Sequence, residues 1–419
     1  MPLTKYIKLS SQAQNLGFSP ERLERIAPFL QKTYLDTGRM PCAQFLVARR
    51  GTIAYQCTLG SMSAPAPGSV ESPNLLREDA IFRLYSMTKP ITSVAFMMLV
   101  EEGRVALDEP VSRYIPEFAG LQVYESGELG SFKSRPPQRP MLILDLLRHT
   151  SGFTYGFQQR TPVDAAYRAL ELVDVKRQGT LEDFIQKLAT LPLEFSPGTS
   201  WNYSVSTDVL GYLVQKISGQ RFEDFLQERL LKPLGMIDTD FQVPASKISR
   251  LTSCYAATPT GGMNLVDDAS KSECLEAPSL PSGGGGLMGT TADYYRFCKM
   301  LMHGGELEGK RYLGRKTIEF MQSNHLPGGK YLPELSVSMF SESVFNGVGF
   351  GLGFSVVQDP TQTMIPGSVG EAAWGGMAST AFWLDPKEDL FAIFMTQLIP
   401  SSSYPVRRQL RTMVYSALA

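Results

Sequence analysis

The stretch RLYSMTKPITS, residues 83–93, places a serine three residues before a lysine where a strand-like run gives way to a helix. Positions i and i+3 share one face of a helix, so Lys89 can reach Ser86. Pro90 is tolerated in the first helical turn, which puts Ser86 at the N-terminus, where the helix dipole favours negative charge. Serine is also a common helix cap, so the pattern alone does not distinguish a nucleophile from a cap.

The overall composition is that of an ordinary globular protein. The 419 residues are 43% hydrophobic and 19% charged, and the net charge of −1 predicts no basic surface for nucleic acid or anionic lipid. The first residues, MPLTKYIKLSSQAQ, lack the apolar stretch of a signal peptide, and no segment approaches the roughly 18 apolar residues of a membrane span. We therefore expect a cytoplasmic protein without a membrane partner.

Neither a metal nor an organic cofactor is predicted. The five cysteines are scattered without a C-x-x-C pair, so buried free thiols are favoured over a zinc or redox site. The three histidines form no H-E-x-x-H pattern. Gly283–Gly286 lacks the G-K-[ST] ending of a phosphate loop and is interpreted as a flexible loop before a helix.

A serine nucleophile needs a base, and the sequence offers two kinds. The G-x-S-x-G motif of α/β-hydrolases is absent, and His149 in LLRHTSGF is typical of a hydrogen-bonded loop histidine. A lysine serves when burial and nearby positive charge favour its neutral amine. Tyr203 lies in SPGTSWNYSVSTDVLGYLV (196–214), just before a helix that begins near Ser206, and its hydroxyl can act as a proton relay. Taken alone, Tyr203 is also typical of an aromatic residue that packs in the core.

A third motif, EAAWGGMAST (371–380), stands directly before a strand. Gly375 and Gly376 would let a substrate approach the backbone closely. A backbone N–H there can join that of Ser86 as the second donor of an oxyanion hole. Taken singly, the two glycines also fit a bulge or a turn.

Strand patterns occur at both ends of the chain and helical patterns in between. AQFLVAR and TIAYQCT flank an Arg-Gly turn and predict a hairpin, and strands return after residue 345. Helices are predicted over 19–38, 87–102, 142–148, 163–176, 180–190, 206–218, 221–231, 291–303 and 404–418. The fold class is therefore α+β. Residues 1–85 and 340–419 would form an α/β domain with an antiparallel sheet, residues 86–339 a mainly helical domain, and the cleft between them the active site.

In this order and at these separations, the three motifs resemble the serine β-lactamase and penicillin-binding protein superfamily, above all its class C-like branch and the family VIII carboxylesterases. They are Ser86-Met87-Thr88-Lys89, Tyr203-Ser204-Val205 and Trp374-Gly375-Gly376. The surrounding stretches LLRHTSGF, PGTSWNYS, KISG, PLGM and SGGGGLMGTTAD resemble the same family. The likeness runs from about residue 20 to the C-terminus.

The resemblance implies a β-lactamase/transpeptidase-like fold, with an antiparallel sheet flanked by helices and an inserted all-helical domain. It implies that Ser86 is the acylated nucleophile and that Lys89 and Tyr203 shuttle its proton. The N–H groups of Ser86 and Met377 would form the oxyanion hole. No cofactor is implied.

Two departures from the class C pattern bear on the substrate. Val205 stands where those β-lactamases have an asparagine, and Trp374 stands where they have a lysine. With Gly375 and Gly376, Val205 and Trp374 would contact substrate, and the apolar character of Val205 and Trp374 favours uncharged, hydrophobic esters. The absence of an apolar lid segment favours short acyl chains. A β-lactamase or D-amino-acid peptidase, an acyltransferase, and a penicillin-binding sensor without turnover remain alternatives.

Overall fold

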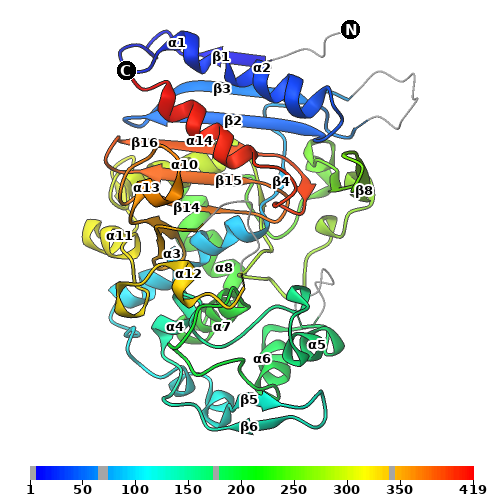
Figure 1. The fold of residues 1–419 in the computed structure, drawn as a ribbon, viewed down its shortest axis with the longest axis vertical. Coiled ribbons are helices and arrows are strands. Elements are labelled where there is room, and N and C mark those ends of the chain that lie inside the picture. The colour runs from blue at the N-terminus through cyan, green and yellow to red at the C-terminus, as the bar shows by residue number, and fades with distance from the viewer. Residues whose placement is uncertain (1–5, 65–73, 173–178, 339–344) are drawn as a thin grey trace.

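An eight-stranded antiparallel sheet lies in the upper half of the protein as drawn in Figure 1, above most of the helical segment. The computed structural model describes residues 6–64, 74–172, 179–338 and 345–419. The strand order is β1-β3-β2-β16-β15-β14-β13-β12. The strands are β1 (Tyr6–Leu9), β2 (Cys42–Arg49), β3 (Thr52–Gly60), β12 (Val348–Phe350), β13 (Ser355–Val357), β14 (Ala372–Gly375), β15 (Ala381–Asp385) and β16 (Leu390–Met395). The two ends of the chain therefore meet in one sheet, as the strand patterns predicted.

The predicted β2–β3 hairpin is confirmed. Arg50 and Gly51 form its turn, both with positive φ, the conformation that matches the twist of a two-residue hairpin. Along β2, Phe45 packs into one core and Leu46 into the other. Both faces of the sheet are thus buried, which requires a helical layer on each side.

One face is covered by α1 (Pro20–Leu23), α2 (Ile26–Leu30) and α14 (Val406–Ser416). The helix predicted over 19–38 is interrupted. Pro28 lacks an N–H and its ring clashes with the carbonyl four residues earlier, so α1 ends at Leu23 and α2 begins at Ile26. A π-helical segment, Gln31–Leu35, continues α2.

The other face is covered by α3 (Thr88–Glu101) and α10 (Thr291–Met302). Every residue of α3 from Thr88 to Leu99 is buried, because α7 (Ser206–Ser218) packs on it from the side away from the sheet. The helix that begins after the S-x-x-K serine is therefore the central element of the fold.

The remaining helices build a layer around α3 and α7 or connect it to the sheet. They are α4 (Ile143–Leu147), α5 (Pro162–Ala169), α6 (Leu181–Ala189), α8 (Phe222–Leu226), α9 (Lys232–Leu234), α11 (Arg315–Met321), α12 (Leu332–Leu335) and α13 (Pro360–Thr363). The predicted helix 163–176 ends at Ala169, and 173–178 lie outside the described residues. The predicted helix 221–231 changes to π-helical geometry at Gln227–Leu231.

Short strands outside the eight-stranded sheet form separate small sheets. They are β4 (Phe82–Arg83), β5 (Val123–Ser126), β6 (Lys133–Arg135), β7 (Cys254–Ala257), β8 (Met263–Asp267), β9 (Met288–Gly289), β10 (Glu306–Leu307), β11 (Lys310–Arg311) and β17 (Leu398–Ile399). Since β4 pairs with β9 and α10 packs on β16, the segment 86–339 also contributes to the sheet layer. The boundaries at 85/86 and 339/340 stay predictions.

The state of the five cysteines agrees with the expectation from their spacing. All five cysteines are free and buried, as their scatter predicted. Within the described ranges, no helix is long and apolar enough to cross a lipid bilayer.

Candidate active site

Ser86 lies in a tight turn between β4 and α3. A 3₁₀ turn, η2 (Tyr85–Met87), leads directly into α3 at Thr88. Tyr85 has φ +44°, a left-handed backbone that costs energy for a bulky residue and marks a constrained position. Ser86 is half-buried and lines a cavity of about 980 Å³. The predicted strand-to-helix junction is confirmed, and the hydroxyl opens into a cavity.

Lys89 lies one turn into the helix and points back to Ser86. Its Nζ is 3.3 Å from Ser86 Oγ and donates to the carbonyl of Gly284 at 2.7 Å. The residue is 2% exposed, and Nζ lies 4.4 Å from the ring centroid of Tyr203. The amine is thereby held beside the hydroxyl and away from bulk water.

Tyr203 reaches the same hydroxyl from the loop before α7. Its OH donates to Ser86 Oγ at 2.5 Å, and the residue is buried. Ser86 Oγ is therefore in contact with both Lys89 and Tyr203. The structure brings together the three side chains that the sequence motifs singled out.

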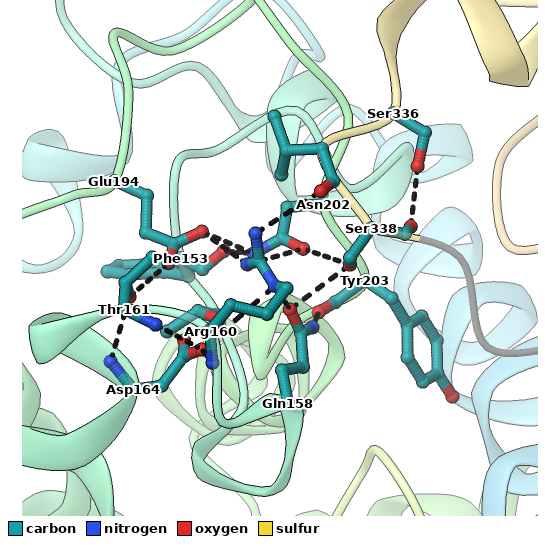
Figure 2. A network of polar contacts seen from close by, with 12 residues as sticks. Phe153, Gln158, Arg160, Thr161, Asp164, Glu194, Asn202, Tyr203, Ser336 and Ser338 are labelled. Carbon is teal, nitrogen blue, oxygen red and sulfur yellow. Dashed lines mark hydrogen bonds and ion pairs between the residues drawn. The ribbon is translucent and has the colours of Figure 1, made fainter.

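A polar network holds the main chain of Tyr203 from behind (Figure 2). The Gln158 amide Nε2 donates to the Tyr203 carbonyl at 2.5 Å. The Gln158 Oε1 accepts from Arg160 at 2.9 Å and from Ser338 at 3.1 Å. Ser338 Oγ also lies 3.0 Å from Asn202 Oδ1. The sequence analysis did not identify this support, whose members come from separate segments.

The glycine cluster before α10 has a role that the sequence reading missed. Gly284 presents its carbonyl to Lys89, while its N–H donates to the buried carboxylate of Asp208 at 3.0 Å. Ser282 also donates to Asp208. A Cβ on Gly284 would lie 2.4 Å from Asp208 Oδ2, so only glycine fits between the side chains of Lys89 and Asp208. The loop is a tightly bonded part of the site rather than a flexible connection.

The sheet contributes the opposite wall through the end of β14. Trp374, Gly375, Gly376 and Met377 all line the cavity. A Cβ on Gly376 would lie 2.4 Å from the carbonyl of Leu84, so glycine allows the strand end to approach the nucleophile segment.

Two backbone donors are available at this approach. Among the residues that the structure describes, the N–H groups of Ser86 and Met377 donate no hydrogen bond. By contrast, the Met87 N–H donates to Leu84 and the Gly376 N–H to Thr380. N–H groups that donate no hydrogen bond and lie at a cavity wall are suited to stabilise an oxyanion.

The two residues expected to set selectivity occupy different environments. Trp374 is half-buried in the cavity wall, with its ring 5.5 Å from that of Tyr203 and 5.3 Å from that of Phe350. Val205 is fully buried at the start of α7 and does not line the cavity. Its position is that of a packing residue, so the structure does not bring Val205 to the substrate side.

His149 is the hydrogen-bonded loop histidine that the sequence indicated. It is buried, with Nδ1 3.3 Å from Ser204 Oγ and its ring 5.1 Å from that of Tyr203. Burial, and secondarily the charge of Lys89, hold the pKa of His149 well below its usual value. The imidazole is therefore neutral at pH 7 and packs behind Tyr203. In the described part of the chain, no three His, Cys, Asp or Glu side chains are placed to bind a metal.

Known proteins resemble this chain over most of its length. The Beta-lactamase family model matches residues 29–413. Protein Rv1367c of Mycobacterium tuberculosis is 35% identical over 331 residues, covering 78% of this chain and 80% of that protein. Esterase EstB of Burkholderia gladioli is 29% identical over 406 residues, covering 91% and 92%. The solved structure of EstCE1, a hydrolase with promiscuous acyltransferase activity, superposes with a TM-score of 0.76 at 25% identity, covering 97% of this chain and 100% of that one.

Proposed function

The chain belongs to the beta-lactamase family, and on this premise we propose that it is a carboxylesterase that works through a covalent acyl-enzyme on Ser86. The observation that carries the proposal is the pair of contacts to Ser86 Oγ from Lys89 and Tyr203 at the wall of a large cavity. A serine needs such a partner to lose its proton as it attacks. The neutral, buried His149 has no contact with that hydroxyl in the described residues.

The proposed reaction has two balanced steps. Ser86 Oγ attacks the ester carbonyl carbon, its proton passes to the Lys89–Tyr203 pair, and the N–H groups of Ser86 and Met377 receive the charge on the carbonyl oxygen. The carbon–oxygen bond to the alcohol breaks, and the departing alkoxide takes the proton. A water molecule then attacks the acyl carbon and gives a proton to the same pair. The pair passes this proton to Ser86 Oγ as the bond between Oγ and the acyl carbon breaks and the carboxylic acid leaves.

The cavity wall supports a preference for uncharged esters. Beside the proposed catalytic residues, the rings of Tyr155, Trp201 and Trp374 pack around the ring of Tyr203 in this wall. A cavity of about 980 Å³ is at the upper end of the range found for small-molecule sites. The proposal of short acyl chains rests on the sequence, and the size of the cavity leaves room for a larger alcohol. The name of EstB and the description of EstCE1 support ester chemistry.

An acyltransferase is the second candidate, and the description of EstCE1 favours it. EstCE1 is described as a hydrolase that also transfers acyl groups. The same acyl-enzyme on Ser86 would serve if an alcohol replaced water in the second step. Product analysis with p-nitrophenyl butyrate and added alcohol separates the two, because transfer yields a new ester and hydrolysis yields butyrate.

The central test identifies the nucleophile and the substrate class. A phosphonate should label only the peptide that contains Ser86, and Ser86→Ala should lose both the label and the hydrolysis of p-nitrophenyl butyrate. Ser401→Ala, at a serine in the same cavity wall, is the matched control and should retain both. Label on another serine, or activity in Ser86→Ala, would contradict the proposal. A higher kcat/KM for nitrocefin than for the ester would favour the β-lactamase alternative.

A further inference from the structure

Arg407, at the start of α14, ties together the two ends of the loop that follows β14. Its Nη2 donates to the carbonyl of Gly376 at 2.8 Å and to that of Thr380 at 2.9 Å. The Gly376 N–H donates to the same Thr380 carbonyl at 2.9 Å. Met377 lies at the tip of the loop thus closed, with its side chain 37% exposed.

Glycine at position 375 makes room for this arrangement. A Cβ there would lie 2.7 Å from Arg407 Nη2 and 2.7 Å from the Thr380 carbonyl. A larger residue would therefore displace the guanidinium or open the loop. Gly375 and Arg407 therefore form one structural unit.

The carbonyl that Arg407 contacts belongs to the same peptide group as the Met377 N–H. That carbonyl, Gly376 O, accepts from the Arg407 cation and also from the Ser379 N–H at 3.1 Å. A charge-assisted bond to an amide oxygen polarises the amide and strengthens its N–H as a donor. The planar peptide also fixes the direction of the N–H once the oxygen is held.

We propose that Arg407 is a positioning residue of the oxyanion hole, which orients and polarises the Gly376–Met377 peptide toward the substrate carbonyl oxygen. The inference rests on the proposed acyl-enzyme function and assigns to it a residue from the C-terminal helix. Arg407 acts through the Met377 N–H, so its effect belongs to the transition state, in which the oxygen carries negative charge.

Neighbouring arginines of α14 have other partners and provide controls. Arg408 donates to the carbonyl of Met364 at 3.2 Å. Arg411 forms an ion pair with the buried Glu371 at 2.9 Å. Neither contacts residues 376–380 in the described structure. Arg408→Gln thus removes the same charge from the same helix without touching the loop.

The experiment compares Arg407→Gln, Arg407→Lys and Arg408→Gln with the unmodified protein. Removing a direct oxyanion donor costs about 10²–10³ in kcat, so a residue that acts through that donor should cost about 10–100-fold in kcat, with KM changed less than about threefold. Affinity for phenylboronic acid, which forms a tetrahedral adduct on Ser86, should fall by a similar factor. Arg407→Lys should recover part of both losses, and Arg408→Gln should stay within about twofold.

Each result decides a separate question. Phosphonate labelling of Ser86 gives the concentration of folded, reactive sites. Because kcat is calculated per labelled site, a partly unfolded preparation does not lower it. Unchanged kcat and boronate affinity in Arg407→Gln would overturn the inference while the esterase assignment stands on Ser86→Ala. A lower kcat with unchanged boronate affinity would also overturn it. If Arg407→Gln does not fold, Arg407→Met, which keeps an apolar side chain of similar length without the cation, is measured instead. A kcat and a boronate affinity equal to those of the unmodified protein would then contradict the proposal.

Discussion

The two walls of the cavity supply different kinds of chemistry. The helical wall provides reactive side chains, Ser86, Lys89 and Tyr203, each fixed by buried hydrogen bonds. The sheet wall provides the backbone N–H of Met377 and the apolar surface of Trp374. Changes to the helical wall should therefore abolish proton transfer. Changes to the sheet wall should alter selectivity or charge stabilisation.

The largest expected effect separates the two walls directly. Lys89→Ala and Tyr203→Phe should each lower kcat by at least about a hundredfold, because each removes a group that we propose to shuttle the serine proton. Met377→Ala should remain within a few-fold, because it retains the backbone N–H. Steady-state kinetics with p-nitrophenyl butyrate measures both. A loss in Met377→Ala as large as that in Tyr203→Phe would contradict the division between side-chain and backbone chemistry.

The next prediction concerns selectivity in the sheet wall. Trp374→Lys should raise the kcat/KM ratio of nitrocefin to p-nitrophenyl butyrate by about 10–100-fold, because the lysine gives the cephalosporin carboxylate a polar partner. The ratio of the two kcat/KM values is measured because the loss of packing against Tyr203 should lower the rates with nitrocefin and with the ester alike. Val205→Asn is the matched comparison, and its ratio should change less than about threefold while its Tm falls, because Val205 is buried away from the cavity. A larger change in Val205→Asn would restore the selectivity role expected from sequence.

A smaller effect is expected where the helical wall is supported from outside. Gln158→Ala removes the hydrogen bond to the Tyr203 carbonyl and should lower kcat by about 2–10-fold, the equivalent of one net hydrogen bond. A double-mutant cycle with Tyr203→Phe gives the control. The two losses should not add, because Gln158 acts through Tyr203. Full additivity would show that Gln158 acts elsewhere.

The smallest expected effect on activity is at His149. Its pKa is lowered in the folded protein, so the unfolded chain binds a proton below about pH 6.5 that the folded protein does not. The free energy of unfolding should therefore fall as the pH drops below that value, by up to about 1.4 kcal/mol per unit from this group. Denaturant titrations between pH 7 and 5.5 should show a shallower dependence in His149→Gln. A variant that folds normally but is inactive at pH 7 would revive the histidine base.

Local geometry explains which parts of the site were predictable. The contact between Ser86 and Lys89 follows from helix periodicity over three residues, so the sequence alone predicts it. The shared sheet was predictable because strand patterns occur at both ends of the chain. The bonds from Gln158 to Tyr203 and from Arg407 to Gly376 span 45 and 31 residues. They depend on how separate segments pack, which no local pattern encodes.

Val205 shows a different limit of sequence reasoning. Its motif position predicted contact with substrate, and Tyr203, two residues earlier, does line the cavity. Val205 is the N-cap residue directly before α7, and its side chain is buried in the hydrophobic core. The direction of a side chain at a loop–helix junction depends on the backbone path through the turn, which the motif does not determine.

The pairing of β2 with β16 has a consequence for synthesis on the ribosome. The partner strand of Cys42–Arg49 is made about 340 residues later, which at roughly 5–20 residues per second is an interval of about 17–70 s. During that time the β2–β3 hairpin has an open edge and two uncovered apolar faces. The helix carrying Ser86 is complete long before the strand that faces it. The yield of folded protein in cells therefore depends on protection of this hairpin until translation reaches residue 395.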